Sequence, residues 1–136
     1  IVKFRTNIFL RGRQPKVKLA EIQKVLEAEV LCGMEWLDRD AKSACGSDLM
    51  SDVLAFTKER TILLTGLTNI QVIRTAEMSD LAAIIFVRGK RPGPEVIVLA
   101  REMGIPLLLT ARQMYEACGM LYKDGLAGSS PKEDAL

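Results

Sequence analysis

The sequence predicts an α/β domain, a three-layer α/β/α sandwich whose mostly parallel sheet is built from βαβ units. Between residues 61 and 122, short apolar runs alternate with amphipathic helical patterns. These runs are continuously apolar, as in parallel strands that are covered on both faces. The length of 136 residues fits one domain with a substantial core. Together these observations favour two βαβ crossovers with helices on both sides of the sheet.

The first third of the chain is predicted to alternate helix and strand. Residues 18–29 place leucine, isoleucine and valine at helical spacing, and the apolar run 28–33 predicts a strand that ends at Gly33. After a polar, turn-like stretch, residues 41–47 predict a short strand and residues 48–59 a second helix. Ser47 is expected to cap that helix, and the charge of Asp48 suits its positive end.

The second half has clearer boundaries. Its strands are predicted at residues 61–66, 81–89 and 106–110. Helices are expected between and after them: Thr68–Gln71 and Thr110–Gln113 both fit the S/T-x-x-E/Q capping box, which places a threonine N-cap at each helix start. The helix between these two is expected to begin at Pro94, which needs no backbone N–H there, and to end at Gly104.

The two ends of the chain differ in composition from the domain. Residues 1–16 contain basic side chains and no acidic one. Such an arm can bind nucleic acid or anionic lipid, or it can be a flexible leader, and residues 1–17 are assigned to a flexible basic leader. Residues 124–136 are small and polar, and they are predicted to be a disordered tail from about residue 125. The α/β domain is thereby assigned to residues 18–123.

The composition excludes several kinds of chemistry. Histidine is absent, so Ser–His and Cys–His nucleophile pairs cannot form within one chain. The three cysteines have no close ligand spacing, which indicates neither a zinc site nor a disulfide framework and favours a reducing cytoplasm. The cysteines are expected to be core residues. Cys118 is expected on the inward face of the last helix, and Cys32 and Cys45 flank turns, where exposure is the alternative. No apolar run approaches the roughly 18 residues of a membrane span.

A ligand site is predicted where parallel strands end, because ligands of such sheets bind at the carboxyl ends of the strands. Helix starts there would also point backbone N–H groups at an anion. The candidate ligand-binding residues are Ser47, Asp48, Thr65, Gly66, Thr68, Asn69, Arg88, Gly89, Lys90 and Thr110. Each has a structural alternative: the threonines as helix caps, the glycines as tight turns, and the basic residues as solvated loop charge.

No nucleotide-hydrolysis motif is present. The stretch "TGLTN" lacks the Gly-Lys-Ser/Thr ending of a Walker A loop. In "GKRPGP" the two prolines remove N–H donors that a phosphate-binding loop requires. No catalytic residue, metal or cofactor is therefore predicted, and Arg88 and Lys90 are expected at most to bind an anion.

The stretches "GSDLMSDVLAF", "ILLTGLTN", "AIIFVRGKRPGPEVIVLAREMGIPLLLT" and "ARQMYEACGML" make the chain resemble DRTGG domains. With the helix and strand at 18–33, the resemblance spans about residues 18–122. Residues 84–110 are also similar to the amino-terminal domain of HPr kinase/phosphorylase. The Asp-Arg-Thr-Gly-Gly stretch that names the family is missing, and its nearest counterpart is Thr65–Asn69.

The resemblance implies an accessory module with no catalytic activity of its own. Similar domains lie beside CBS domains in regulated pyrophosphatases and in larger cobyrinic-acid-synthase-like proteins, and some stand-alone members are encoded near iron-only hydrogenase genes. We therefore expect a non-catalytic regulatory or protein-interaction module, a cytoplasmic homodimer with a protein partner in a redox (hydrogenase-type) or metabolic system. The alternative is a sensor that binds an adenine nucleotide or another anion at the strand ends. Nucleic-acid binding through residues 1–16 ranks third, and no membrane association is expected.

Overall fold

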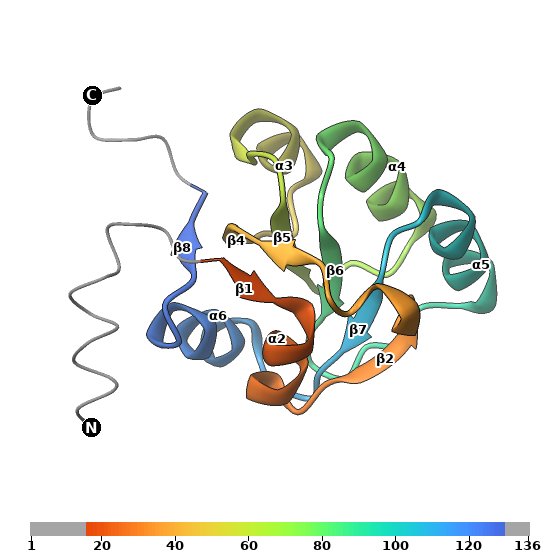
Figure 1. Ribbon diagram of the computed structural model, residues 1–136. Coiled ribbons are helices and arrows are strands. Elements are labelled where there is room, and N and C mark those ends of the chain that lie inside the picture. Colours follow the sequence, from red (N-terminus) through yellow and green to blue (C-terminus); the bar gives the residue numbers. More distant parts are fainter. Residues whose placement is uncertain (1–15, 130–136) are drawn as a thin grey trace.

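The computed structural model describes residues 16–129, which form a six-stranded sheet between two layers of helices (Figure 1). The strand order is β2-β7-β6-β5-β4-β8; β2 runs antiparallel to β7, and the other neighbours are parallel. The strands are β2 (Glu29–Cys32), β4 (Ser43–Gly46), β5 (Thr61–Thr65), β6 (Ala83–Phe86), β7 (Leu107–Leu109) and β8 (Ala127–Gly128). A separate two-stranded sheet joins β1 (Val17–Lys18) to β3 (Asp40–Ala41).

The helices lie on both faces of the large sheet, as the sequence predicts. On one face are α2 (Leu19–Leu26) and α6 (Met114–Lys123). On the other are α3 (Met50–Phe56), α4 (Ile70–Ser79) and α5 (Pro94–Met103), as Figure 1 shows. A 3-10 turn, η2 (Met34–Trp36), follows β2. The fold is therefore the mixed α/β sandwich expected, with an antiparallel strand at one edge.

Burial on both faces explains why the central strands read as unbroken apolar runs. Along β5, Ile62 and Leu64 pack in the core under α2 and α6, while Leu63 packs in the core under α3 to α5. On β6, Ile85 packs in the first of these cores and its neighbour Phe86 packs in the second. All five side chains are fully buried. Since burying one such side chain stabilises the fold by roughly 1.5–3 kcal/mol, these strands anchor the loops at their ends.

The start and end of α5 match the sequence prediction. Pro94 is the first helical residue, where its missing N–H costs nothing. Gly104 caps the carboxyl end with φ 74°, and its N–H returns to the helix carbonyls. Both ends of α5 therefore follow from local residue chemistry.

The predicted threonine and serine caps are wrong. The N-cap of α4 is Asn69 and not Thr68, and the N-cap of α6 is Gln113 and not Thr110. Neither N-cap makes a side-chain capping hydrogen bond. At α3 the N-cap is Leu49, and Ser47 instead closes a tight turn by accepting the Leu49 N–H at 3.0 Å. Each helix starts later than its motif indicates.

The prediction of disorder from about residue 125 is also wrong for the residues that the structure describes there. Leu126 is 2% exposed and packs in the core beneath α2 and α6. The chain then forms β8 beside β4, and the N–H of Ser129 donates to the carbonyl of Ala44 at 3.2 Å. The buried side chain of Leu126 and the pairing of β8 with β4 thus hold residues 126–129 on the domain.

Residues 1–15 and 130–136 lie outside the described part of the chain. The basic leader predicted for residues 1–17 therefore stays a prediction, except that Val17 lies in β1. The disorder predicted for 130–136 likewise stays a prediction. Within residues 16–129, no helix is long and apolar enough to cross a membrane.

Candidate functional site

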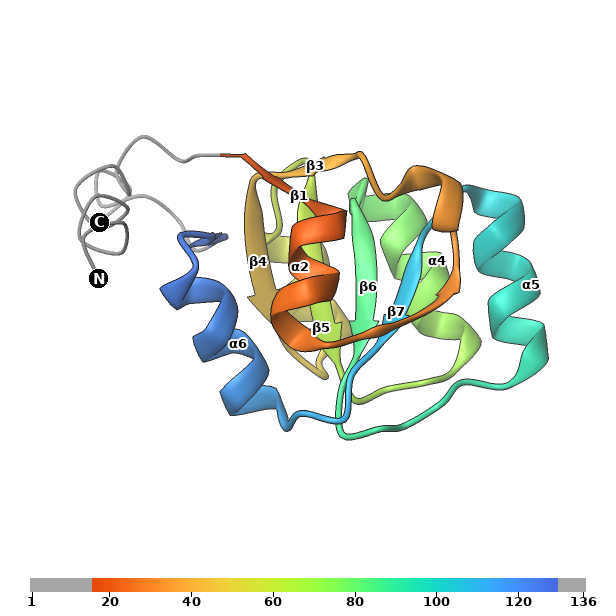
Figure 2. The ribbon, with the colours of Figure 1, turned by 60° about the horizontal axis from the view of Figure 1, so that its bottom comes forward.

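The predicted loops lie at one edge of the sheet, where β4, β5, β6 and β7 end. These strands are parallel, so their carboxyl ends share that edge, which Figure 2 shows as the group of loops leading into α4, α5 and α6. We call Asp48, Thr65, Gly66, Arg88 and Thr110 at this edge the strand-end rim. Hydrogen bonds and close contacts connect its members across the strands.

Asp48 connects the end of β4 to the end of β5. Its Oδ1 accepts a hydrogen bond from the Thr65 hydroxyl at 2.9 Å and another from the Gly66 N–H at 2.7 Å. Thr65 Oγ1 also accepts the N–H of Leu67 at 3.2 Å. Charge-assisted bonds of this kind are stronger than neutral ones, so the carboxylate fixes the turn after β5. The sequence prediction gave Asp48 a helix-dipole role and did not anticipate this contact.

Arg88 occupies a tight turn after β6. Its φ is 60° and that of Gly89 is 66°, and the Lys90 N–H donates to the Val87 carbonyl at 3.2 Å to close the turn. The backbone N–H of Gly89 donates to the carbonyl of Thr110 at 2.9 Å, which joins this turn to the end of β7. A non-glycine residue at such a φ carries backbone strain of about 1–2 kcal/mol, which the backbone hydrogen bonds of this turn offset.

The Arg88 side chain extends back over β5. A Cβ added at Gly66 would lie 2.5 Å from Arg88 Nη2, so the guanidinium rests directly on that glycine. Arg88 is exposed, and no hydrogen bond or ion pair of its guanidinium occurs within residues 16–129. The rim therefore presents one exposed guanidinium beside the Asp48 carboxylate.

Thr110 has a structural role, and its buried hydroxyl is not available to a ligand. Its side chain is 1% exposed, and its hydroxyl donates to the carbonyl of Leu26 at 2.9 Å. The same oxygen accepts the N–H of Arg112 at 3.2 Å. The hydroxyl thus joins the end of α2 to the end of β7.

The remaining predicted residues are less closely connected. Thr68 is half-buried, while Asn69 and Lys90 are exposed, and within residues 16–129 no side-chain hydrogen bond or ion pair joins these three to Asp48 or Arg88. Ser47 lies beside Asp48, with its N–H on the carbonyl of Leu64 at 3.0 Å. The structure therefore brings together the ends of four strands but not every residue of the predicted loops.

Two ion pairs flank the rim. Arg91 contacts Glu29 at 2.7 Å, and Arg112 contacts Glu27 at 3.2 Å. The Arg91 hydrogen bond lowers the pKa of the Glu29 carboxyl. Both pairs are solvent-exposed and contribute little stability. Their effect is on charge, because they neutralise Arg91 and Arg112 and leave Arg88 as the exposed arginine of the rim.

The cysteines do not form a reactive centre. Cys32 is 4% exposed, as expected for a core cysteine, whereas Cys45 and Cys118 are half-buried. Burial raises the pKa of the Cys45 and Cys118 thiols, which keeps them protonated and poorly nucleophilic. Residues 16–129 hold no cluster of three metal-ligating side chains.

Sequence reasoning missed two hollows. One, of about 670 Å³, runs along α6 and β8 and is lined by residues that include Gly46, Tyr115, Cys118 and Leu126. The other, of about 350 Å³, lies at the opposite edge of the sheet from the rim and is lined by Arg39, Arg60, Asp80, Leu81 and Ala82. The residues of each come from separate segments, so no motif spacing could have revealed them.

Comparisons with known proteins agree on the fold. The family model described as "DRTGG domain" matches residues 21–123. A similar solved structure contains the CBS and DRTGG domains of the regulatory region of Clostridium perfringens pyrophosphatase, complexed with its activator diadenosine tetraphosphate. Its TM-score is 0.67 at 17% identity, over 97% of this chain and 62% of that chain. No curated protein matches the chain in sequence.

Proposed function

We propose that this chain, which belongs to the DRTGG domain family, is a non-catalytic regulatory module that responds to an anionic ligand, an adenine nucleotide in the first instance, at its strand-end rim. The observation that carries this proposal is the position of Arg88. Its exposed guanidinium lies over Gly66, at the edge where parallel α/β sheets bind ligands. An arginine fork suits phosphate oxygens at such a place.

The helix starts around Arg88 support an anion. The N-cap residues of α4, α5 and α6 are Asn69, Gly93 and Gln113, and none makes a side-chain capping bond. Their first-turn N–H groups are therefore not occupied by cap side chains. Helix N-termini carry partial positive charge, which favours phosphate.

Asp48 limits what kind of anion fits. Its carboxylate already occupies the Gly66 N–H, and its negative charge repels a phosphate placed directly over β4. A ligand whose phosphate contacts Arg88 and whose hydroxyl or amino groups face Asp48 avoids that repulsion. A nucleotide offers both kinds of group. The activator bound to the Clostridium perfringens pyrophosphatase region is also an adenine nucleotide.

Regulation without catalysis agrees with the residues at the rim. The sequence has no histidine to act as general base, and the Asp48 carboxylate is engaged by Thr65 and Gly66. Homodimer formation stays a prediction from the family resemblance, and light scattering of the purified chain tests it. A partner in a redox system likewise stays a prediction, because neither the fold nor the comparisons bear on it.

A thermal-shift screen with AMP, ADP, ATP and inorganic phosphate tests the proposal. A ligand that binds only the folded state stabilises it by roughly 2.7 kcal/mol at a hundred times Kd. We expect a nucleotide to raise Tm and Arg88→Asn to abolish the rise. Absence of a shift with every nucleotide contradicts the sensor role. Turnover of a nucleotide by the pure protein, lost in Arg88→Asn, contradicts the non-catalytic role.

A further inference from the structure

A polar cavity of about 350 Å³ lies at the amino-terminal edge of the sheet, opposite the strand-end rim. Arg60 immediately precedes β5, Leu81 and Ala82 immediately precede β6, and Arg39 immediately precedes β3. With Asp80 they form what we call the amino-edge cavity. Its lining combines two arginines and one aspartate, a charge content that differs from the apolar cores on either side.

Arg39 is held rigidly at this cavity. Its Nη1 donates to the carbonyl of Gly104 at 2.9 Å, and its guanidinium lies 4.8 Å from the centroid of the Trp36 ring. The Arg39 backbone is fixed as well, since its carbonyl accepts the N–H of Leu19 at 3.0 Å. A guanidinium held in this way loses little conformational freedom when a ligand binds.

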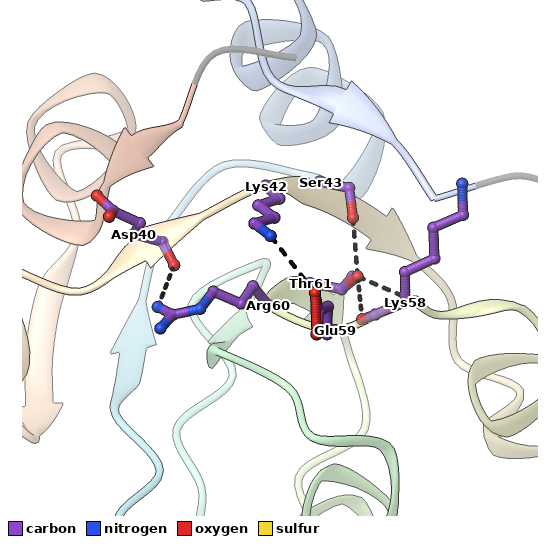
Figure 3. A network of polar contacts seen from close by, with 7 residues as sticks. All are labelled: Asp40, Lys42, Ser43, Lys58, Glu59, Arg60 and Thr61. Atoms are coloured by element: carbon purple, nitrogen blue, oxygen red, sulfur yellow. Dashed lines mark hydrogen bonds and ion pairs between the residues drawn. The ribbon is translucent and has the colours of Figure 1, made fainter.

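Arg60 is held from a different direction. Figure 3 shows its side chain reaching toward the main chain of Asp40, where Nη1 donates to the carbonyl oxygen at 3.3 Å. The Arg60 backbone has φ 60°, a strained conformation for a residue other than glycine. Its carbonyl accepts the N–H of Lys42 at 2.9 Å. Arg60 is thus fixed at both its backbone and its side chain.

The nearby carboxylates are engaged elsewhere. Glu59 pairs with Lys42 at 3.4 Å (Figure 3), and Asp40 pairs through its side chain with Lys18 at 3.2 Å. Arg60 is consequently left without an ion pair among residues 16–129, and so is Arg39. The lining therefore combines two guanidinium groups with one carboxylate, that of Asp80, and it carries a net positive charge.

We propose that the amino-edge cavity binds a small organic anion, with its phosphate or carboxylate group on Arg39 and Arg60 and a hydroxyl group donating to Asp80. Guanidinium forks match the geometry of both oxyanions. The volume equals that of roughly a dozen water molecules, so a bare ion would leave most of it to solvent. The aspartate favours a ligand that also carries a donor. This site is independent of the strand-end rim.

An NMR titration of the full chain with glycerol 3-phosphate and with glycerate tests the proposal and separates the two head groups. Both probes carry hydroxyl groups, and each has one kind of oxyanion. We expect saturable shifts of the Leu81 and Ala82 amides with at least one probe, while the amides of Gly66 in the strand-end rim and of Gly89 next to Arg88 stay unchanged. Neutral glycerol is the control and should shift neither pair.

Substitutions then assign the binding to the arginines. Arg60→Asn suits the left-handed backbone and removes the guanidinium, and we expect it to weaken binding roughly tenfold or more. Arg74→Gln removes an exposed arginine on α4 and should bind as the unaltered chain does. Arg60→Gly serves as a second variant of the same turn. The proposal is overturned if neither probe shifts Leu81 and Ala82, or if both Arg60 variants bind unchanged.

Discussion

The guanidinium of Arg88 fills the space that a side chain at position 66 would need. An ideal Cβ on Gly66 would lie 2.5 Å from Nη2 of Arg88. Gly66 does not have a positive φ, in contrast to Gly89 at 66°. Glycine at 66 therefore makes room for the neighbouring arginine and does not serve a special backbone conformation. This relationship links a residue without a side chain to the proposed ligand contact.

Replacing Gly66→Ala should displace the Arg88 guanidinium and weaken nucleotide binding at the rim. The added methyl group meets the far end of a flexible side chain, which can move away. We therefore expect the free energy of unfolding to change by less than about 1 kcal/mol. Isothermal titration with ADP measures the affinity, and urea denaturation measures the stability.

The contrasting variant for the effect on stability is Gly89→Ala. No atom lies within 4 Å of a Cβ at position 89, but the φ of 66° makes any side chain strained there. This variant should lose about 1–2 kcal/mol of stability through the backbone. Unchanged ADP affinity in Gly66→Ala would show that the position of Arg88 does not matter for binding.

Arg88→Asn should have opposite effects on stability and on binding. Asparagine adopts the left-handed conformation more readily than arginine, so relief of strain at φ 60° should stabilise the fold by up to about 1 kcal/mol. Loss of the guanidinium should abolish the thermal shift caused by nucleotide. Urea midpoints and thermal shifts of the same preparations check both effects. A loss of stability in Arg88→Asn would indicate that contacts of the arginine side chain stabilise the fold.

The strands could be predicted from sequence because their signal is local. Residues 61–65 are uniformly buried, so a run of apolar residues suffices to find them. The threonine caps could not be predicted in this way. The hydroxyl of Thr110 bonds to the carbonyl of Leu26, which is 84 positions away, and that partner appears only once α2 packs beside β7. A capping box describes only what a threonine can do locally.

The same limit applies to the sites. The loops of the rim were predictable because parallel strands must end at one edge. The contact between Asp48 and Gly66 was not, since it depends on where the turn after β4 places a carboxylate. The amino-edge cavity combines Arg39, Arg60 and Asp80 from three separate turns, so no spacing along the chain marks it.

Leu126→Ala should destabilise the domain by about 2–5 kcal/mol, the usual cost of truncating a buried leucine. Leu126 is 2% exposed and lies just before β8, in a segment whose composition predicted disorder. Met78→Ala is the control, because Met78 is 73% exposed and should change stability by less than about 0.5 kcal/mol. Equal urea midpoints for the two variants would mean that the segment after α6 does not hold the core.

The half-buried thiols of Cys45 and Cys118 should make stability fall at alkaline pH. Burial raises the pKa of Cys45 and Cys118 above their ordinary value of 9.0. Above pH 9 the unfolded chain releases thiol protons that the folded chain retains, so the free energy of unfolding decreases as pH rises through the folded pKa values. Urea midpoints at pH 8 and pH 10 measure the decrease. Other groups titrate in this range, so the comparison is with a Cys45→Ala, Cys118→Ala double variant, which should lose less stability between the two pH values. An equal loss in both chains would mean that the thiols ionise alike in the folded and unfolded states.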